Sequence, residues 1–274
     1  MMNHKPTISE HFSWHRHPFT DTWRLDRPFL SAAETRTFSL ASSLIKMGKG
    51  FALCGPSGSG KTSFLGHFTQ TLDTRHYRPC TIPYGGFNRA GVLKLLADAM
   101  GVDASGRRTP LVHRLHTHIQ QLSQQQQSLH PVLIIDDAQH LERPSLLDLC
   151  ALIAGPANTV TASIILVGDQ SLAKQLSLSV MAPVYSRLAT IFLQPLLSEE
   201  ETNLFINHRL DQARAKRELF QPDAVSLIAA QTSGNRRQIM NLATLLLQEA
   251  YERGEQTVSS QLIMESSFFQ PLVT

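Results

Sequence analysis

Apolar runs alternate with amphipathic stretches along the first two thirds of the chain, and this alternation predicts strands and helices in turn. Several runs stay apolar at successive positions, as strands buried on both faces do. The predicted strands are residues 51–54, 80–84, 131–135, 162–167 and 190–193, and the predicted helices are 31–47, a helix that begins near Lys61, 90–100 and 110–121. Because strands and helices that alternate in this way pair in parallel through right-handed crossovers, we expect an α/β fold, a five-stranded parallel sheet sandwiched by helices.

The pattern changes near residue 198, beyond which only helical periodicity remains. We expect helices that begin at Ser198, Pro222 and Asn235 and that form a small all-helical lid domain. The N-terminal residues are rich in His, Pro and aromatic side chains, and we expect their segment 11–19 to be an ordered arm rather than a helix. The predicted organisation is an N-terminal arm at 1–30, an α/β domain at 31–196 and a helical lid at 197–274.

The composition indicates a protein with a large core. Of its 274 residues 42% are hydrophobic, and the formal charge of +3 permits binding to a polyanion without requiring it. The three cysteines show no C-x-x-C spacing, which is typical of buried thiols in a reducing compartment. There is no apolar leader and no run of about 18 apolar residues. We therefore expect a cytoplasmic location and no membrane-spanning segment.

The clearest candidate chemistry lies in a glycine-rich loop between the strand 51–54 and the helix that follows it. The octet fits the pattern G-x-x-x-x-G-K-[ST] at every fixed position, and its residues are Gly55, Pro56, Ser57, Gly58, Ser59, Gly60, Lys61 and Thr62. Glycines let backbone N–H groups turn toward phosphate oxygens, and the start of the helix adds positive potential. We expect these residues and Ser63 to bind ATP, with Lys61 on the β- and γ-phosphates and Thr62 on Mg²⁺.

Two carboxylates follow the continuous apolar run 131–135, which makes this run a Walker B strand. In P-loop enzymes the first carboxylate, here Asp136, holds Mg²⁺ opposite the Thr62 hydroxyl. The second position polarises the attacking water, and here Asp137 occupies it. Because its side chain is one methylene shorter than the Glu that is usual there, we expect slow hydrolysis.

Four further polar residues stand where a bound nucleotide could be sensed. Asp169 and Gln170 follow the strand 162–167, at the edge where α/β sheets hold ligands, and either residue is a candidate sensor of the γ-phosphate. Arg187 stands just before the last strand. Arg237 lies in the first turn of the helix that begins at Asn235 and is the phosphate-facing candidate of the helical part.

Taken in chain order, the P-loop, the Walker B strand, the polar-ended fourth strand, an arginine before the fifth strand and a helical tail with Gly-Asn-x-Arg resemble the AAA+ ATPases. The resemblance covers nearly the whole chain. It places Asp169 at the sensor-1 position, Arg187 at the arginine finger and Arg237 at sensor 2. It also implies that Arg187 acts on the ATP of a neighbouring subunit, so that the active form is a ring or a helical filament.

Shorter motifs resemble the ExeA-like group of AAA+ proteins, and within it the transposase-associated helpers similar to MuB, IstB, TnsC and TniB. They include Arg27-Pro28-Phe29-Leu30, Asp136-Asp137-Ala138-Gln139, Leu166-Val167-Gly168-Asp169 and Leu193-Gln194-Pro195-Leu196. The resemblance implies a regulator of DNA transposition that oligomerises on duplex DNA with ATP, recruits or stimulates a transposase of the DDE integrase type, and disassembles on hydrolysis. By position it implies largely sequence-independent DNA contacts at Arg89, Lys94, Arg107 and Arg108, for which a solvated basic face is the competing interpretation.

Two alternative functions stay open from the sequence. The first is a cytosolic ExeA-like ATPase that assists secretion or pilus assembly, although such proteins usually continue into a transmembrane helix and a peptidoglycan-binding region that this sequence lacks. The second is a nucleotide-binding switch that hardly hydrolyses ATP.

Overall fold

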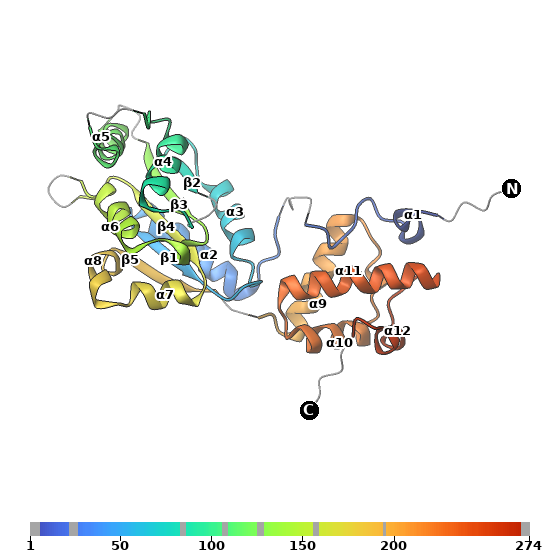
Figure 1. Cartoon of the computed structure of the whole chain (residues 1–274). Coiled ribbons are helices and arrows are strands. Elements are labelled where there is room, and N and C mark those ends of the chain that lie inside the picture. Colours follow the sequence, from blue (N-terminus) through green and yellow to red (C-terminus); the bar gives the residue numbers. More distant parts are fainter. Residues whose placement is uncertain are drawn as a thin grey trace. The chain divides into compact units, whose positions relative to one another are not determined.

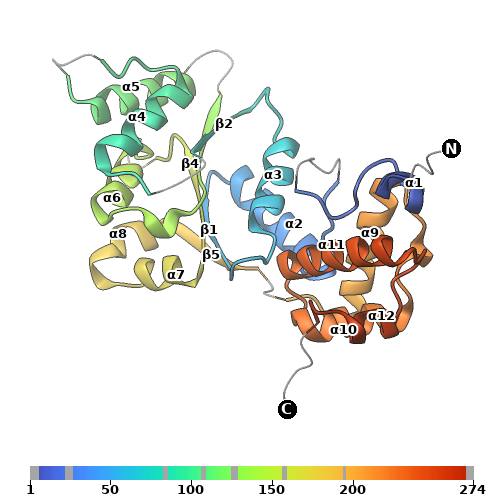
Figure 2. The same ribbon diagram turned by 45° about the vertical axis from the view of Figure 1, so that its right-hand side comes forward.

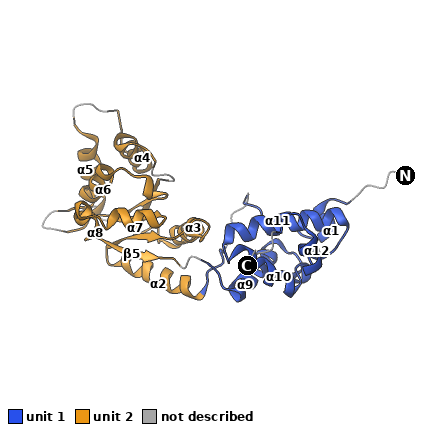
Figure 3. Cartoon of the chain, turned by 60° about the horizontal axis from the view of Figure 1, so that its bottom comes forward, with its two compact units in different colours: residues 1–31, 194–274 blue, residues 32–193 orange. Residues whose placement is uncertain are grey.

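The chain folds into two compact units, which are described separately here. The computed structural model describes residues 6–21, 27–82, 86–105, 109–124, 129–155, 159–193 and 196–269. One unit, the α/β unit, comprises Ala32–Leu193, and the other, the helical unit, comprises Met1–Ser31 and Gln194–Thr274 (Figure 3).

The α/β unit alternates strands with helices, as its apolar runs predict. Its strands are β1 (Gly50–Cys54), β2 (Tyr77–Ile82), β3 (His130–Ile135), β4 (Ser163–Gly168) and β5 (Leu188–Phe192). Its α-helices are α2 (Ala32–Lys46), α3 (Lys61–Thr71), α4 (Arg89–Met100), α5 (Leu111–Gln124), α6 (Arg143–Leu152), α7 (Gln170–Leu176) and α8 (Ala182–Tyr185). Two short 3₁₀ turns, η1 (Ala138–His140) and η3 (Ser179–Met181), lie among them.

The five strands form one parallel sheet in the order β2-β3-β4-β1-β5. This confirms the predicted five-stranded parallel sheet. Because all strands point the same way, the loops that leave their carboxyl ends gather along one edge. The glycine-rich loop leaves β1, the carboxylates Asp136 and Asp137 leave β3, and Asp169 leaves β4.

Alternate residues of each central strand face the two helical layers. On one face, Ala52 and Cys54 belong to a core with side chains of α4 to α8. On the other face, Phe51 packs edge-on against Phe68 of α3, with 5.9 Å between ring centroids, and Phe38 of α2 meets Phe68 at 5.5 Å. Figures 1 and 2 show α2 and α3 on one side of the sheet and α4 to α8 on the other. The sheet is therefore buried on both faces, which explains why its strands read as continuous apolar runs.

The helical unit joins the N-terminal segment to the C-terminal helices. Its elements are α1 (Ile8–Phe12), α9 (Glu199–Ala213), the 3₁₀ turn η4 (Arg217–Leu219), α10 (Pro222–Thr232), α11 (Arg236–Arg253) and α12 (Ser260–Glu265). Ser198 begins α9 with a capping box to Glu201. None of the described helices has both the length and the apolar character needed to cross a bilayer.

The aromatic N-terminal segment packs within the helical unit. It carries the short helix α1, whose last two residues, His11 and Phe12, lie in the segment expected to be an arm, so that expectation is wrong for these two residues. Phe12, Trp14 and Phe19 are buried in the same core as α9 to α12. The N-terminal segment thus belongs to the same compact unit as the C-terminal helices. Sequence periodicity could not reveal this, because the partners of these rings lie some two hundred residues further along the chain.

Buried Arg209 of α9 holds this segment in place. Its guanidinium donates hydrogen bonds to the carbonyl oxygens of Pro18, at 2.7 Å, and Thr20, at 2.8 Å. Burial lowers the pKa of Arg209 to about 10. Because a buried cation without hydrogen bonds is costly, these two carbonyls compensate much of the desolvation of the side chain.

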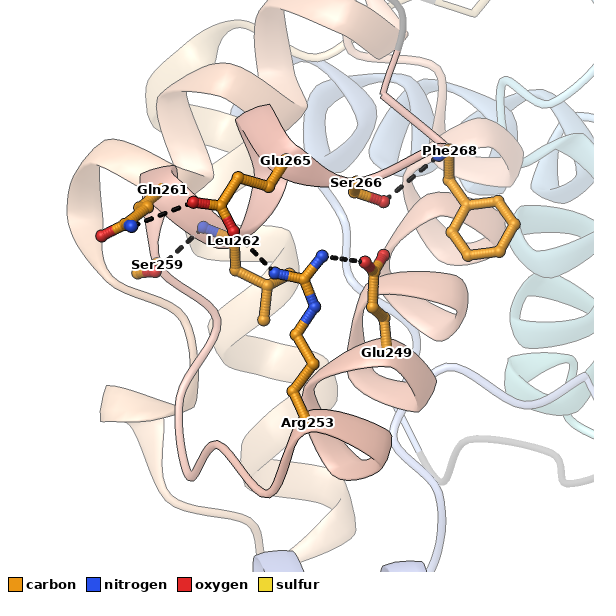
Figure 4. A network of polar contacts seen from close by, with 8 residues as sticks. All are labelled: Glu249, Arg253, Ser259, Gln261, Leu262, Glu265, Ser266 and Phe268. Carbon is orange, nitrogen blue, oxygen red and sulfur yellow. Dashed lines mark hydrogen bonds and ion pairs between the residues drawn. The ribbon is translucent and has the colours of Figure 1, made fainter.

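Polar contacts fix α12 to the end of α11 (Figure 4). Arg253 bonds to Glu249 within its own helix and to Glu265 of α12, the latter at 2.8 Å. Gln261 donates to the other oxygen of Glu265 at 2.9 Å, and the Ser259 hydroxyl accepts from the Leu262 amide as the cap of α12. Since these groups are partly exposed, we expect the network to orient α12 more than to stabilise it.

The turn before α11 is packed too tightly to accept any side chain. Gly234 has a φ of +72°, and a Cβ atom there would lie 1.9 Å from the carbonyl oxygen of Leu197. The Leu197 amide donates to the Gly234 carbonyl oxygen at 3.0 Å. Glycine is therefore needed at this position for two reasons: the positive φ angle, and the close approach of the segment at Leu197.

We predict that Gly234→Ala destabilises the helical unit far more than Gly254→Ala. Gly254, at the end of α11, also has a positive φ, +75°, but no heavy atom lies within 4 Å of the added Cβ. The control should lose about 1 kcal/mol from backbone strain, and Gly234→Ala about 1–3 kcal/mol more from overpacking. Urea unfolding followed by far-UV circular dichroism measures both. Equal losses would contradict the close packing of this turn.

Candidate nucleotide-binding site

The glycine-rich loop connects β1 directly to α3. Gly58 and Gly60 have positive φ angles, +79° and +90°, which glycine adopts without strain. The amide of Gly55 donates to the carbonyl oxygen of Gly168 in β4 at 3.1 Å, so the loop is attached to the neighbouring strand as well as to its own. A Cβ atom at Gly55 would lie 2.9 Å from the Ser59 hydroxyl oxygen. The loop is therefore folded tightly around its own backbone, as a phosphate cradle requires.

Lys61 places a positive charge inside this loop. Its ammonium nitrogen donates to the carbonyl oxygens of Gly55 and Pro56, at 2.8 and 2.9 Å. Lys61 is also the first residue of α3, whose N-terminal end carries a partial positive charge. The ammonium and the helix end thus face the same loop, and the arrangement fits the phosphates of a nucleotide.

Thr62 and Asp136 meet although 74 positions separate them in the sequence. The Thr62 hydroxyl donates to an oxygen of the Asp136 carboxylate at 3.2 Å. Burial raises the pKa of Asp136, and bonds from the Asp137 amide and the Thr62 hydroxyl partly offset this effect. A hydroxyl and a carboxylate side by side are hard oxygen ligands of the kind that Mg²⁺ prefers, so these two residues fit the metal of a nucleotide complex.

Asp137 is held in an unusual backbone conformation at the start of η1. Its φ is +49°, in the left-handed region. Its carboxylate accepts a hydrogen bond from the side-chain amide of Gln139 at 3.1 Å, and the carbonyl oxygen of that amide accepts from the backbone amide of Asp169 at 3.3 Å. In the sequence, Gln139 is part of the motif Asp136-Asp137-Ala138-Gln139, but the motif alone assigns it no role.

Asp169 caps a helix in the structure. Its carboxylate accepts a bond from the Ser171 amide at 2.7 Å and one from the Ser171 hydroxyl, and this hydroxyl lowers the pKa of Asp169. Lys61 lowers the same pKa through its charge, so Asp169 does belong to the loop edge of the sheet. Gln170, the alternative sensor, is the exposed first residue of α7.

Arg187 lies at the opposite end of the sheet from the glycine-rich loop. It directly precedes β5, whose first residue, Leu188, pairs with Gly50 at the start of β1. Its exposed side chain bonds the thiol of buried Cys150 and lowers its pKa, which burial raises to about 11. The length of β1, about 3.3 Å per residue, thus separates Arg187 from the loop of its own chain.

Arg237 lies in the helical unit, in the first turn of α11. Its backbone amide donates to the side chain of Asn235, the cap of this helix, at 3.1 Å, and its side chain is exposed. The adjacent Arg236 is instead buried, with its guanidinium carbon 6.0 Å from the centre of the Phe29 ring.

The four candidate DNA contacts differ in their surroundings. Arg89 pairs with Asp148 of α6, with one N–O distance of 2.8 Å, whereas Lys94 of α4 is exposed. Arg107 and Arg108 lie outside the described residues. A cavity of about 360 Å³ at the end of α4 and along α5 adds basic groups that the site prediction had not included. It is lined by Gly101, Val102, Thr109, His113, Arg114, Thr117, His118 and Gln121.

Comparisons with known proteins agree with this geometry. Residues 46–176 match the family model described as AAA domain. The fold is similar to the ORC2 protein of Aeropyrum pernix solved with ADPNP and ADP, with 15% identity, a TM-score of 0.66, and coverage of 90% of this chain and 69% of the other. It is similar to the Aeropyrum pernix ORC1 protein in complex with DNA, with 17% identity, a TM-score of 0.66, and coverage of 89% and 66%.

A third similar structure is the RuvB Holliday junction branch migration motor of Thermotoga maritima, with 17% identity, a TM-score of 0.54, and coverage of 84% of this chain and 66% of the other. No curated protein sequence matches the chain. The fold is that of AAA+ proteins, and the glycine-rich loop, Thr62 and Asp136 fit a nucleotide with its metal ion. The chain contains an AAA domain over residues 46–176, and this domain holds the glycine-rich loop, Asp136 and Asp137.

We predict that Asp136→Asn removes ATP hydrolysis and stabilises the nucleotide-free protein at neutral pH. Burial raises the folded-state pKa of this carboxyl above its usual 3.8, so its ionised form costs stability at pH 7. An uncharged amide should relieve this penalty, a gain on the order of 1 kcal/mol. Thermal unfolding in EDTA measures it. The gain should shrink as the pH falls toward 3.8, because Asp136 then becomes neutral too, and Asp98→Asn, at an exposed carboxyl of α4, serves as the control.

Proposed function

We propose that this protein is an ATP-dependent DNA-binding regulator of DNA transposition, which assembles on duplex DNA with ATP and recruits or stimulates a transposase. The observation that carries the nucleotide-dependent part is the meeting of Lys61, Thr62 and Asp136 at one edge of the sheet. The short ExeA-like motifs support the assignment to transposition. The protein acts as a switch, since ATP favours the assembly and hydrolysis reverses it.

In the proposed reaction, Lys61 and the loop amides bind the phosphates. Thr62 and Asp136 would hold Mg²⁺, which would neutralise negative charge on the phosphates. Asp137 accepts a proton from the attacking water while the water oxygen bonds to the γ-phosphorus. The bond from that phosphorus to the bridging oxygen breaks, and its electron pair leaves with ADP. The short side chain of Asp137 makes this step slow, so the ATP-bound assembly persists.

Arg187 is proposed to complete the site of a neighbouring subunit. Its position at the far end of β1 from its own loop supports this role, because a group there cannot reach the phosphates bound by the same chain. A head-to-tail contact between such surfaces repeats from copy to copy and gives a ring or an open filament. Asp169 or Gln170 within the subunit and Arg237 from the helical unit are proposed as phosphate sensors.

The proposed DNA contacts come from basic groups on α4 and α5. Lys94 is exposed, and Arg114 and His113 line the cavity at the end of α4 and along α5. Arg89 is the weaker candidate of the original set, because its ion pair with Asp148 must break or be shared before it binds a phosphate. The solved complex of the structurally similar ORC1 protein with DNA supports a DNA-bound function for this fold.

We predict that Arg187→Ala and Asp137→Asn restore each other's ATPase activity when mixed. Each variant alone should lose it, by about 10³-fold or more for an arginine finger. In a mixture, roughly one interface in four joins an intact Asp137 of one chain to an intact Arg187 of the next, so about a quarter of the wild-type turnover should return. Phosphate release on a DNA template measures this.

A mixture of Lys61→Ala with Asp137→Asn is the matched control. Both defects lie in the same half of the shared site, so no activity should return. A mixture of Arg187→Ala and Asp137→Asn that stays inactive, while both proteins assemble, would contradict the role of Arg187 in a neighbour's site.

We predict that the protein with a slowly hydrolysed ATP analogue binds duplex DNA of unrelated sequences alike, and that salt weakens this binding steeply. If six to ten phosphates are neutralised, the affinity should fall by about 10³-fold or more between 50 and 200 mM salt. Lys94→Ala should reduce the slope of log affinity against log salt by about one, whereas Arg75→Ala, which removes an exposed cation paired with Asp73, should not. Gel shift or fluorescence anisotropy measures both.

No binding at 50 mM salt would contradict the DNA-binding function and would favour the alternative of a secretion or pilus ATPase, whose partner is a protein. Electron microscopy of the same samples shows whether rings or filaments form.

A further inference from the structure

Gln139 links the two sheet loops that carry the acidic residues of the nucleotide site. It lies in η1, directly after β3, and its side chain reaches the residue that follows β4. Its amide nitrogen donates to Oδ1 of Asp137 at 3.1 Å, and its amide oxygen accepts from the backbone amide of Asp169 at 3.3 Å. A single side chain thus spans the ends of two neighbouring strands.

Glycine at position 168 is what lets Gln139 approach β4. A Cβ atom on Gly168 would lie 2.7 Å from the amide oxygen of Gln139, closer than real Cβ contacts permit. The same loop is fixed to α7 by Gln175, whose side-chain amide donates to the Leu141 carbonyl oxygen at 3.0 Å. The contacts at this edge of the sheet therefore fix the position of the Gln139 side chain.

The hydrogen bond from Gln139 restrains the carboxylate of Asp137, which has little other support. Asp137 is exposed, and its backbone sits in the left-handed region, so neither burial nor helix geometry fixes its carboxylate. Among the described residues, Gln139 is the side chain that donates to this carboxylate, and it does so through Oδ1. No described residue donates a hydrogen bond to the other oxygen, Oδ2.

We propose that Gln139 is a positioning residue for ATP hydrolysis, which holds the Asp137 carboxylate in the orientation that accepts a proton from the attacking water. This inference rests on the proposed role of Asp137. It adds to that role an explanation of how a short side chain can act as the base. The Glu usual at this position would reach the water by itself, whereas the shorter Asp137 is held in place by a hydrogen bond. Gln139 also connects the base to the end of β4, where Asp169 lies, so a shift of that loop moves the base.

The test compares Gln139→Ala and Gln139→Glu with wild type, in the presence of DNA. Gln139→Ala should lower kcat about tenfold or more, a part of the 10²- to 10⁴-fold that a general base contributes. Nucleotide affinity, measured with a fluorescent ATP analogue, should change less than about twofold, because the phosphate-binding loop is untouched. Gln175→Ala, which removes a bond of the same loop away from Asp137, is the control and should leave kcat near wild type.

Gln139→Glu separates positioning from simple support of the loop. A glutamate at this position can still accept from the Asp169 amide, but it cannot donate to Asp137 and places a second negative charge beside it. The lost hydrogen bond and the added charge should lower kcat at least as far as Gln139→Ala does, with nucleotide affinity again nearly unchanged. If Gln139 only supported β4, this variant would keep the kcat of the wild type.

A double variant completes the test. Asp137→Asn with Gln139→Ala should be no slower than Asp137→Asn alone, because the positioned group is already gone. Additive losses, or a wild-type kcat for Gln139→Ala, would overturn the inference while leaving Asp137 as the base. A wild-type kcat for Asp137→Asn would instead refute the proposed role of Asp137 itself, and the positioning role with it.

Discussion

Parallel pairing of the five strands is the constraint on which the site depends. Thr62 and Asp136 are 74 positions apart, yet their side chains meet at 3.2 Å because β1 and β3 end at the same edge. The strand β4 lies between them and contributes Gly168, whose carbonyl oxygen holds the glycine-rich loop, and Asp169. If one strand ran the other way, its five or six residues would carry its loop about 15–20 Å from the others. The same constraint places Arg187 at the opposite end of the sheet, away from the loop of its own chain.

Gathering these groups at one edge has an electrostatic cost. Three carboxylates and one ammonium share it, and burial disfavours the ionised form of Asp136. Backbone groups compensate part of this cost, since the Asp137 amide bonds to Asp136 and loop carbonyls bind the Lys61 ammonium. The doubly covered apolar sheet supplies the stability that lets the edge remain polar and strained, as at Asp137. The same strands therefore bury apolar side chains along their length and carry the polar side chains of the site at their carboxyl ends.

The sequence was sufficient to predict those features that depend on short stretches of chain. The glycine-rich loop, the strand before it and the two carboxylates after β3 follow from local patterns, and the sheet confirms the strands that carry them. Edge strands were less clear. The strand β2 begins at Tyr77, three residues before the predicted start at Cys80, because its first half is only partly buried and includes Pro79, which an edge strand tolerates. Likewise β5 begins at Leu188, two residues before the predicted start, because Ala189 and Thr190 are only partly buried and interrupt the apolar run.

Features that depend on strand order could not be predicted. No local pattern says that β3 lies beside β4, and without that order nothing connects Gln139 with Asp169 or explains why residue 168 must be glycine. The ion pair of Arg89 with Asp148 arises in the same way, from two helices brought together by the crossovers. Arg89 therefore resembled a free basic residue, and Gln139 an ordinary loop residue. What a residue does depends on its long-range contacts. A hydrogen bond from the end of β4 fixes the side-chain amide of Gln139, which then supports the Asp137 carboxylate.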